Sequence, residues 1–167
     1  VTYAKKNKKI LKNILNNKKI RGTIIISNEG INGTISAKKK ILYLVINKIK
    51  KTFKFNNFDS VNFSMSRFQP FHRGKVKIKK EVVPMGIKIS NTKTKNHVDP
   101  IKWNELIKNK NTFLIDARKP FEYKVGTFKR SINPNVNNFR EFPNYLKNLN
   151  KDKTIAMFCT GGVRCEK

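Results

Sequence analysis

Short apolar runs alternate along this chain with stretches of helical periodicity, and this alternation limits the fold to a mixture of helices and sheets. The segment Arg21–Ser27, "RGTIIIS", is rich in β-branched residues and predicts a buried strand. Lys5–Asn17 and Lys38–Lys51 carry apolar residues at spacings of three and four, which predicts a helix in each. We expect a turn at Asn28–Gly33, followed by a short return strand through "GTISA".

Two further segments of the first half alternate between apolar and polar residues, as half-buried strands do. They are Val61–Phe68 and Gly74–Val83. The first half is therefore predicted to run helix, two strands, helix and two strands. One more strand at the front would complete the βαββαβ order of a ferredoxin-like fold. We predict such an α+β domain over residues 1–86, followed by a linker over residues 87–97.

The second half has the strand and helix alternation of an α/β domain. Asp99 and Pro100 suit the N-cap and the first position of a helix. The run "NTFLIDAR" predicts a short apolar strand that ends in Asp116 and Arg118. The run "KTIAMF" lacks polar alternation, which predicts a strand of a parallel sheet that is buried on both faces. A short helix is expected between them, in "FREFPNYLKNL". We assign this domain to residues 98–167 and expect it to be incomplete, because the chain stops inside its last motif.

Both cysteines of the chain lie in its final stretch, "FCTGGVRCEK". Cys159 follows a predicted strand, and functional residues of open α/β sheets follow the carboxyl ends of strands. Gly161 and Gly162 allow a tight loop with inward backbone N–H groups, and Arg164 adds a positive charge; both features stabilise a thiolate. Cys159 is therefore the predicted nucleophile, and an inert buried cysteine is the alternative. Cys165 is either a second thiol of the reaction or a packing residue.

The sequence does not indicate a metal site, a cofactor-binding site, secretion or insertion into a membrane. The spacing of the two cysteines is unusual for zinc, and only His72 and His97 could join them, so no metal site is predicted. No flavin or nicotinamide fingerprint is present, so no cofactor is identified. The chain shows no signal-peptide pattern and no apolar run of transmembrane length, and two cysteines do not make a disulfide scaffold. We therefore predict a cytoplasmic protein without a membrane partner.

The formal net charge of +28 indicates a polyanionic partner, nucleic acid above all. An abundance of Lys, Asn and Ile is also typical of an A/T-rich genome, in which lysines accumulate at solvated positions without a function. Lys75, Lys77 and Lys79 fall on one face of a predicted strand, next to Arg73. Such a row can follow a phosphate backbone, so we predict that these four residues contact RNA.

The spacing within the cysteine loop separates two known enzyme families. Tyrosine-phosphatase-like loops need five residues between Cys and Arg, whereas four residues separate Cys159 from Arg164. The loop therefore resembles the six-residue active loop of the rhodanese family. The stretch "LIDARKPFEYKVGTFKRSINP" also resembles the rhodanese pattern, with Asp116, Arg118 and Glu122 at matching positions. The resemblance implies an α/β rhodanese-like domain in which these three residues have structural roles.

Three stretches in order narrow the resemblance: "GTIIISNEGINGTISA", "PFHRGKVKIKKEVVPMG" and "GTFKRSINPNVNNFREFPNY", the last leading to "AMFCTGGVRCEK". Together they are similar to the bacterial tRNA uridine-34 hydroxylase family, which joins a ferredoxin-like domain to a rhodanese domain. This resemblance implies an oxidoreductase of the monooxygenase type that converts the wobble uridine of tRNA to 5-hydroxyuridine. It further implies molecular oxygen as co-substrate, an unidentified electron donor, and the anticodon region of tRNA as partner; no protein partner is predictable. Family members continue past the last motif, so we expect a fragment that is poorly active alone.

The sequence leaves more than one interpretation of the chemistry open. Cys159, as a thiolate, either adds to the uracil ring or carries an oxidised sulfur intermediate, and Arg164 and the loop N–H groups stabilise the anion. The same loop suits a persulfide sulfurtransferase of the rhodanese type, which needs no oxygen. A third interpretation is an RNA-binding module without catalysis, but the presence of both Cys159 and Arg164 speaks against it.

Overall fold

The computed structural model describes residues 2–87, 97–150 and 152–167. The chain divides into two compact units, residues 1–82 and 83–167, and each is described by itself. The predicted linker, residues 87–97, lies almost wholly outside the described residues, and the predicted domain bounds stay a prediction. No helix among the described residues is long and apolar enough to cross a membrane.

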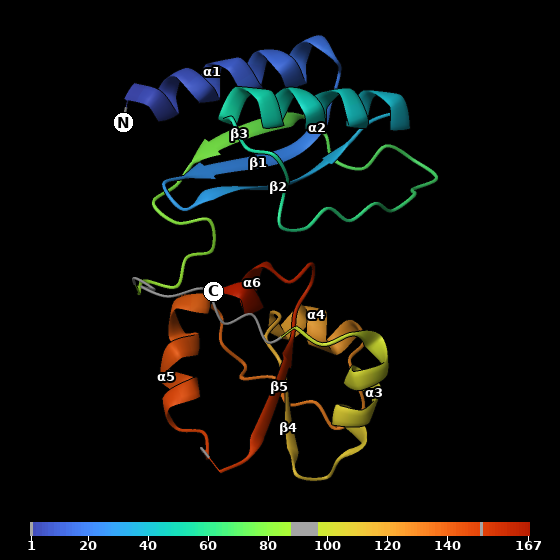
Figure 1. Cartoon of the computed structure of the whole chain (residues 1–167), viewed down its shortest axis with the longest axis vertical. Helices are drawn as coiled ribbons and strands as arrows, with labels where there is room; N and C mark the ends of the chain where they lie inside the picture. Colours follow the sequence, from blue (N-terminus) through green and yellow to red (C-terminus); the bar gives the residue numbers. More distant parts are fainter. Residues whose placement is uncertain (1, 88–96, 151) are drawn as a thin grey trace. The chain divides into compact units, whose positions relative to one another are not determined.

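In the first unit, two helices cover one face of a three-stranded sheet (Figure 1). The helices are α1, Thr2–Asn17, and α2, Lys39–Phe53. The strands are β1, Arg21–Ser27, β2, Gly30–Ser36, and β3, Gly74–Ile78. The strand order is β2-β1-β3, with β1 antiparallel to β2 and parallel to β3. The helices α1 and α2 and the strand β1 confirm the elements that the sequence predicts there.

The core of this unit lies between the sheet and the two helices. Alternate residues of β1 point to the helices, so Ile24 and Ile26 are buried while Ile25 lies half-buried on the other face. The helix α1 contributes Leu11 and Leu15, which are almost fully buried. The complete apolar cluster consists of Leu11, Ile14, Leu15, Ile20, Ile24, Ile26, Val45, Ile49 and Val76. Burial of each large aliphatic side chain contributes about 1.5–3 kcal/mol, so this cluster is the main stabilising feature of the unit.

The hairpin between β1 and β2 depends on two glycines. Gly22 has a φ of 122°, and a Cβ there would overlap the carbonyl oxygen of Thr34. A Cβ on Gly33 would overlap the carbonyl oxygen of Thr23 on the opposite strand. The predicted turn at Asn28–Gly33 is in fact shorter, because β2 already begins at Gly30. Gly22 and Gly33 therefore serve the close approach of the two strands, whereas Gly30, with a φ of 146° and open space at its Cβ position, serves the turn.

The predicted strand at Val61–Phe68 is wrong. The segment has no strand structure, and its apolar residues Phe63, Met65 and Phe68 are exposed. Alternation with a period of two describes an extended chain, but a strand also needs a hydrogen-bonded neighbour, and none appears for this segment among the described residues. The strand predicted at Gly74–Val83 is present but ends at Ile78.

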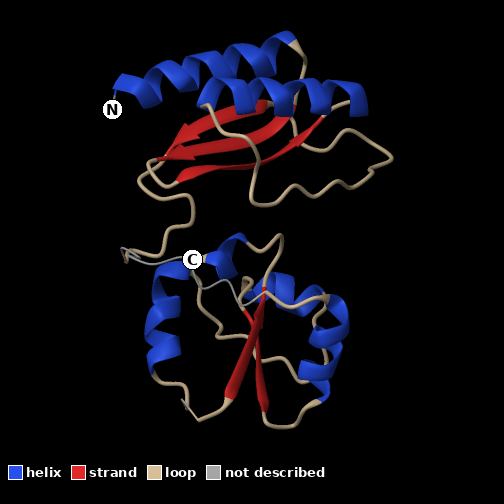
Figure 2. Cartoon of the chain, viewed as in Figure 1, coloured by secondary structure: helices blue, strands red, loops and turns tan. Residues whose placement is uncertain are grey.

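In the second unit, the strands β4, Thr112–Asp116, and β5, Thr154–Phe158, are parallel neighbours (Figure 2). The helices α3 and α5 lie on opposite sides of these strands (Figure 1). The helices are α3, Pro100–Lys108, α4, Pro120–Val125, α5, Phe142–Lys147, and α6, Val163–Glu166, with a 3-10 turn at Phe139–Glu141 before α5. The predicted parallel pairing is confirmed.

The predicted start of α3 is confirmed. The backbone N–H groups of Ile101 and Lys102 donate to Asp99 Oδ1 at 2.8 and 2.9 Å, and Pro100 occupies the first turn, where its missing N–H costs nothing.

The two strands of this unit differ in burial. Leu114 and Asp116 of β4 are buried, whereas Ile155 of β5 is 40% exposed. The prediction of burial on both faces is therefore wrong for β5. The strand β4 has β5 on one side and a bridge from Ile115 to Ile132 on the other, whereas β5 has one neighbouring strand among the described residues.

Candidate active site

The cysteine loop begins where the two parallel strands of the second unit end. Asp116 is the last residue of β4, and Cys159 follows the last residue of β5. The backbone N–H of Ala117 donates to the carbonyl oxygen of Phe158 at 3.0 Å, which ties the two strand ends together. The segments after both strands therefore start from one place, at the carboxyl ends of the sheet where α/β proteins hold their functional groups.

The loop after β5 turns back on its own cysteine. Gly161 and Gly162 have φ values of 74° and 80°, a region that favours glycine, and α6 begins directly after them. The backbone N–H groups of Arg164 and Cys165 then favour the anionic form of the Cys159 sulfur and lower its pKa. Contributions from the N–H groups of Gly161 and Gly162 themselves stay a prediction.

Cys159 is stabilised as a thiolate. The hydrogen bond from the Cys165 thiol is the largest cause that lowers the pKa of Cys159; burial opposes it, and the two backbone N–H groups and the charge of Arg164 reinforce it. The result is a pKa of about 6, down from an ordinary value of 9.0. At neutral pH the sulfur is therefore mostly anionic and nucleophilic.

Cys165 has the opposite character. Its hydrogen bond to Cys159, its burial and the negative charge on Cys159 all raise the pKa of the Cys165 thiol. Cys165 therefore keeps its proton while Cys159 loses one. The two cysteines form an unequal pair, which the sequence left open.

Arg164 is held by Glu122, which lies on α4. The Nη2 atom of Arg164 donates to the two carboxylate oxygens at 3.2 and 3.0 Å, and Nη1 donates to the carbonyl oxygen of Ala117 at 3.2 Å. Glu122 also accepts from Thr160 Oγ1 at 2.9 Å and from the backbone N–H of Lys119 at 3.1 Å. Burial raises the pKa of Glu122, but these donors outweigh it and lower the pKa below its usual range. This ion pair fastens the cysteine loop to α4.

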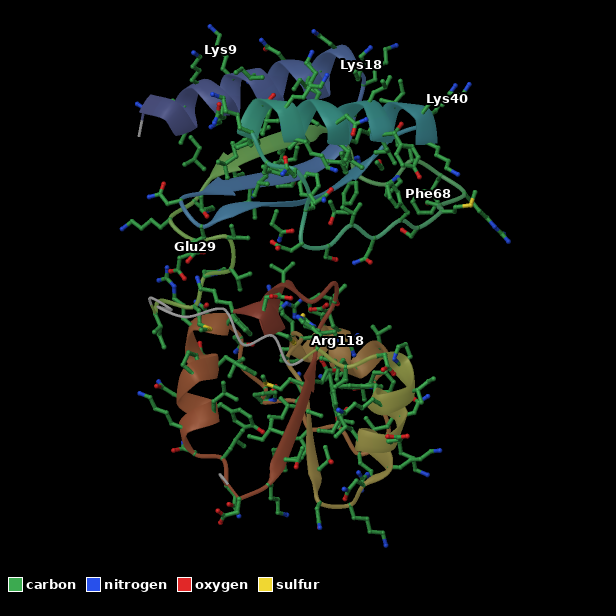
Figure 3. All side chains as sticks on the ribbon, in the orientation of Figure 1. Lys9, Lys18, Glu29, Lys40, Phe68 and Arg118 are labelled. Atoms are coloured by element: carbon green, nitrogen blue, oxygen red, sulfur yellow. The ribbon has the colours of Figure 1, made fainter. Side chains whose placement is uncertain are left out.

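A second ion pair lies at the end of β4. Asp116 is fully buried and accepts from Arg118 Nη2 at 2.6 Å, from Arg118 Nε at 2.9 Å and from Thr127 Oγ1 at 2.9 Å. Burial raises the pKa of Asp116, but the Arg118 side chain, its backbone N–H and Thr127 together lower it. Arg118, labelled in Figure 3, also donates to the carbonyl oxygen of Gly126 at 2.6 Å and lies 5.5 Å from the centroid of the Phe158 ring. This pair holds the segment after β4 against the segment that leads from α4.

A pocket of about 280 Å³ opens beside Cys159. Its lining consists of Arg118, Gly126, Thr127, Phe128, Phe158, Cys159 and Thr160. The Phe128 and Phe158 rings meet edge to face at 4.9 Å between centroids, and Trp103 lies 5.6 and 5.9 Å from them. The pocket thus combines aromatic walls, hydroxyl groups, a guanidinium and a reactive sulfur. The sequence does not indicate Thr127 or Phe128, because both lie far from Cys159 along the chain.

The predicted RNA-contacting cations lie in the first unit. Arg73, Lys75, Lys77 and Lys79 are all exposed, whereas Val76 between them is buried. In the sheet, Lys75 and Lys77 pair with Thr23 and Ile25 of β1, so they share the face that α1 and α2 leave open. Lysines also project from the helical side, where Figure 3 labels Lys9, Lys18 and Lys40. Because the positive charge is not confined to one face, the RNA contact of this row stays a prediction.

The described residues contain no group of three His, Cys, Asp or Glu side chains that could hold a metal ion.

Comparison with known proteins identifies the class of both parts of the chain. Residues 1–82 match the family model of the UPF0176 acylphosphatase like domain, and residues 100–167 match that of the rhodanese-like domain. The chain is therefore an α+β domain of the ferredoxin-like type followed by a rhodanese-like domain, as the sequence predicts.

Three relatives identify the family of the whole chain more closely than the two domain matches do. The proteins named tRNA uridine(34) hydroxylase from Pelagibacter ubique (strain HTCC1062), Prochlorococcus marinus (strain MIT 9215) and Bartonella quintana (strain Toulouse) are 63%, 47% and 42% identical to this chain. The matches cover 100%, 97% and 90% of this chain and 56%, 54% and 51% of the relatives. The chain belongs to the rhodanese-containing family of these relatives, as the sequence resemblance implies. It spans about half the length of the curated relatives it matches.

Proposed function

We propose that the protein to which this chain belongs hydroxylates C5 of the wobble uridine of tRNA, with Cys159 as the nucleophile and molecular oxygen as co-substrate. The observation that carries the proposal is the stabilised thiolate of Cys159 beside an aromatic-walled pocket. The names of the relatives support the choice of tRNA and of this nucleoside. A cytoplasmic location, the anticodon region as the contact and the lack of a bound cofactor remain predictions.

The pocket suits a single pyrimidine base. Unpaired bases in RNA are commonly held by stacking on aromatic side chains, and their edges are recognised by hydrogen bonds. Phe128 and Phe158 offer aromatic surface, and the hydroxyl groups of Thr127 and Thr160 offer hydrogen bonds. We therefore place the wobble uracil in this pocket, with its C6 atom toward Cys159. A wobble base is accessible to such a pocket because it is unpaired in free tRNA.

The thiolate makes C5 of uracil reactive. Addition of the Cys159 sulfur to C6 moves electron density onto C5 and the neighbouring carbonyl oxygen, and C5 becomes an enolate carbon that reacts with oxygen. The guanidinium of Arg118, which lines the same pocket, favours the negative charge of the enolate. The pair of Arg164 and Glu122 keeps the loop N–H groups directed at the sulfur, so that it leaves as a stable thiolate at the end.

The exposed row of Arg73, Lys75, Lys77 and Lys79 is proposed to contact the phosphate backbone of the same tRNA. Phosphate contacts set position and affinity without reading the sequence, so this row would serve all substrate tRNAs alike.

A persulfide sulfurtransferase is the second candidate function. The N–H groups of Arg164 and Cys165, which favour an anionic Cys159 sulfur, would equally stabilise the outer sulfur of a persulfide. This activity requires Cys159 but not oxygen, and its product on tRNA would be a thiolated nucleoside.

The test is mass spectrometry of wobble nucleosides in cells that lack the full-length protein. Cells complemented with the wild type should contain 5-hydroxyuridine derivatives, and cells complemented with Cys159→Ser should lose them, a fall of more than about 1000-fold in turnover. Immunoblots and circular dichroism of both proteins control for abundance and folding. Growth under ¹⁸O₂ should place the heavy isotope in the product. Retained hydroxylation in Cys159→Ser, or loss of a thiolated nucleoside instead, would refute the proposal.

A further inference from the structure

We propose that Cys165 is the redox partner of Cys159, and that the two thiols are oxidised to a disulfide in each turnover and thereby supply the two electrons of the hydroxylation. This inference rests on the proposed function. It assigns the electron donor for which the sequence identified no cofactor.

Cys159 and Cys165 lie on the same apolar cluster, at the two ends of one loop. Gly161 and Gly162 turn the chain between the cysteines, and the Cys165 thiol is the group that most strongly lowers the pKa of Cys159. Both side chains are half-buried and pack against the same cluster of Ile115, Ala117 and Phe142. No disulfide joins the two cysteines in the structure. A disulfide would join the two ends of one short loop and would not require two distant segments to meet.

Cys159 and Cys165 differ in protonation state and therefore have different roles in the reaction. Cys159 is held as a thiolate and carries the nucleophilic attack, whereas Cys165 is held as a thiol and keeps a proton in place. Two thiols with equal tendencies to ionise would compete for the base. The unequal pair ensures that one sulfur adds to the substrate while the other remains available to reduce an oxidised intermediate.

The overall reaction balances with these two thiols as the only reductant. Uridine, one O₂ and two thiols give 5-hydroxyuridine, one disulfide and one water. One oxygen atom enters the nucleoside and the other leaves as water. The two electrons that this requires come from the sulfurs of Cys159 and Cys165. The Cys165 thiol supplies one proton, and the solvent, which holds the proton that Cys159 has lost, supplies the other.

The individual steps follow from the same pair. Cys159 adds to C6, and C5 takes up O₂ and a proton to form a C5 hydroperoxide. With the Cys159 sulfur bonded to C6, the negative charge that raises the pKa of Cys165 is gone. The Cys165 sulfur then attacks the outer peroxide oxygen and passes its proton to the inner one, which leaves a C5 hydroxyl group and a sulfenic acid on Cys165. Loss of the C5 proton expels the Cys159 thiolate and restores the ring double bond. Cys159 then attacks the sulfenic acid, and the disulfide forms with release of water. A second dithiol resets the pair by thiol–disulfide exchange.

Cys165 could also act only through its hydrogen bond, and two variants separate these roles. Cys165→Ser keeps a hydroxyl donor for Cys159 but cannot be oxidised, whereas Cys165→Ala removes the donor as well. The rate of iodoacetamide alkylation against pH reports the Cys159 thiolate, with a midpoint at about 6 in the wild type. The midpoint should remain low in Cys165→Ser and rise in Cys165→Ala.

The experiment is a single turnover by the reduced full-length protein, freed of external reductant and mixed with unmodified tRNA in oxygenated buffer. Mass spectrometry then counts 5-hydroxyuridine and the peptide pair linked through Cys159 and Cys165. We expect one 5-hydroxyuridine and one disulfide per protein molecule, neither of them without oxygen, and no product from Cys165→Ser.

Equal product from Cys165→Ser, or wild-type product without the disulfide, would overturn this inference while the proposed function stands. A wild type that makes no 5-hydroxyuridine even with added dithiothreitol would instead overturn the proposed function, and the inference with it.

Discussion

The two units of this chain bury different kinds of side chain. The buried residues of the first unit are almost all apolar and form one cluster of nine, with Asn7 as a buried polar residue. The second unit has a buried apolar cluster of three, and it also buries the carboxylate of Asp116 together with Thr112 and Ser131. Apolar contacts stabilise a fold without specifying directions, whereas hydrogen bonds and ion pairs orient groups at set distances. The polar interior lies in the unit that holds Cys159, where a reactive group must be oriented.

The largest effect should come from the apolar core of the first unit. Leu11→Ala removes a fully buried side chain and is expected to lower the free energy of unfolding of that unit by about 3 kcal/mol. Leu44→Ala, the same change at a side chain 58% exposed on α2, should cost less than about 0.5 kcal/mol. Hydrogen exchange of the β1, β2 and β3 amides measures both. Similar losses in the two variants would mean that burial does not govern the stability of this unit.

The polar interior of the second unit predicts a smaller and pH-dependent effect. Asp116→Asn removes a charge that Arg118 and Thr127 bind, and should cost about 2 kcal/mol at neutral pH. Because the folded-state pKa of Asp116 is lowered, its stabilisation is full above the unfolded-state pKa of about 4 and is lost as pH falls through the folded-state value.

The deficit of Asp116→Asn relative to the wild type should therefore shrink in acid. Denaturant titrations of both proteins between neutral and acidic pH measure it. Asp152→Asn, at an exposed position of the same unit, is the matched control and should change little at any pH. A deficit that is constant with pH would show that the ion pair is not the cause.

The smallest effect concerns the charge of the first unit. Lys77→Glu should weaken tRNA binding by the full-length protein and reduce the slope of log Kd against log salt by about one. Lys9→Glu makes the same charge change on α1, on the helical side, and should leave the slope unchanged. Filter binding at several salt concentrations measures both. Equal effects from the two variants would favour the explanation from genome composition over a contact surface on the strand.

The sequence predicted those elements whose pattern is strong and local. The strands β1 and β5 and the helices α1, α2 and α3 were expected from β-branched runs, from helical spacing and from the cap at Asp99. The helix α4 was not expected, because its six residues are too few to show a helical period. The segment Val61–Phe68 has the period of a strand but no partner strand among the described residues, and no local pattern shows whether a partner exists.

Some parts of the candidate site could likewise be predicted from the sequence, and others could not. The sequence alone indicated the reactive cysteine, because Cys159 after an apolar strand, two glycines and Arg164 are all neighbours along the chain. The pairing of Arg164 with Glu122, the contact of Thr127 with Asp116 and the position of Phe128 beside Cys159 came only from the folded structure. Turn and strand propensities act between neighbouring residues, whereas these contacts join side chains that the packing of β4, β5 and α4 brings together. The nucleophile can therefore be predicted from neighbouring residues in the sequence. The environment that makes it reactive exists only after folding.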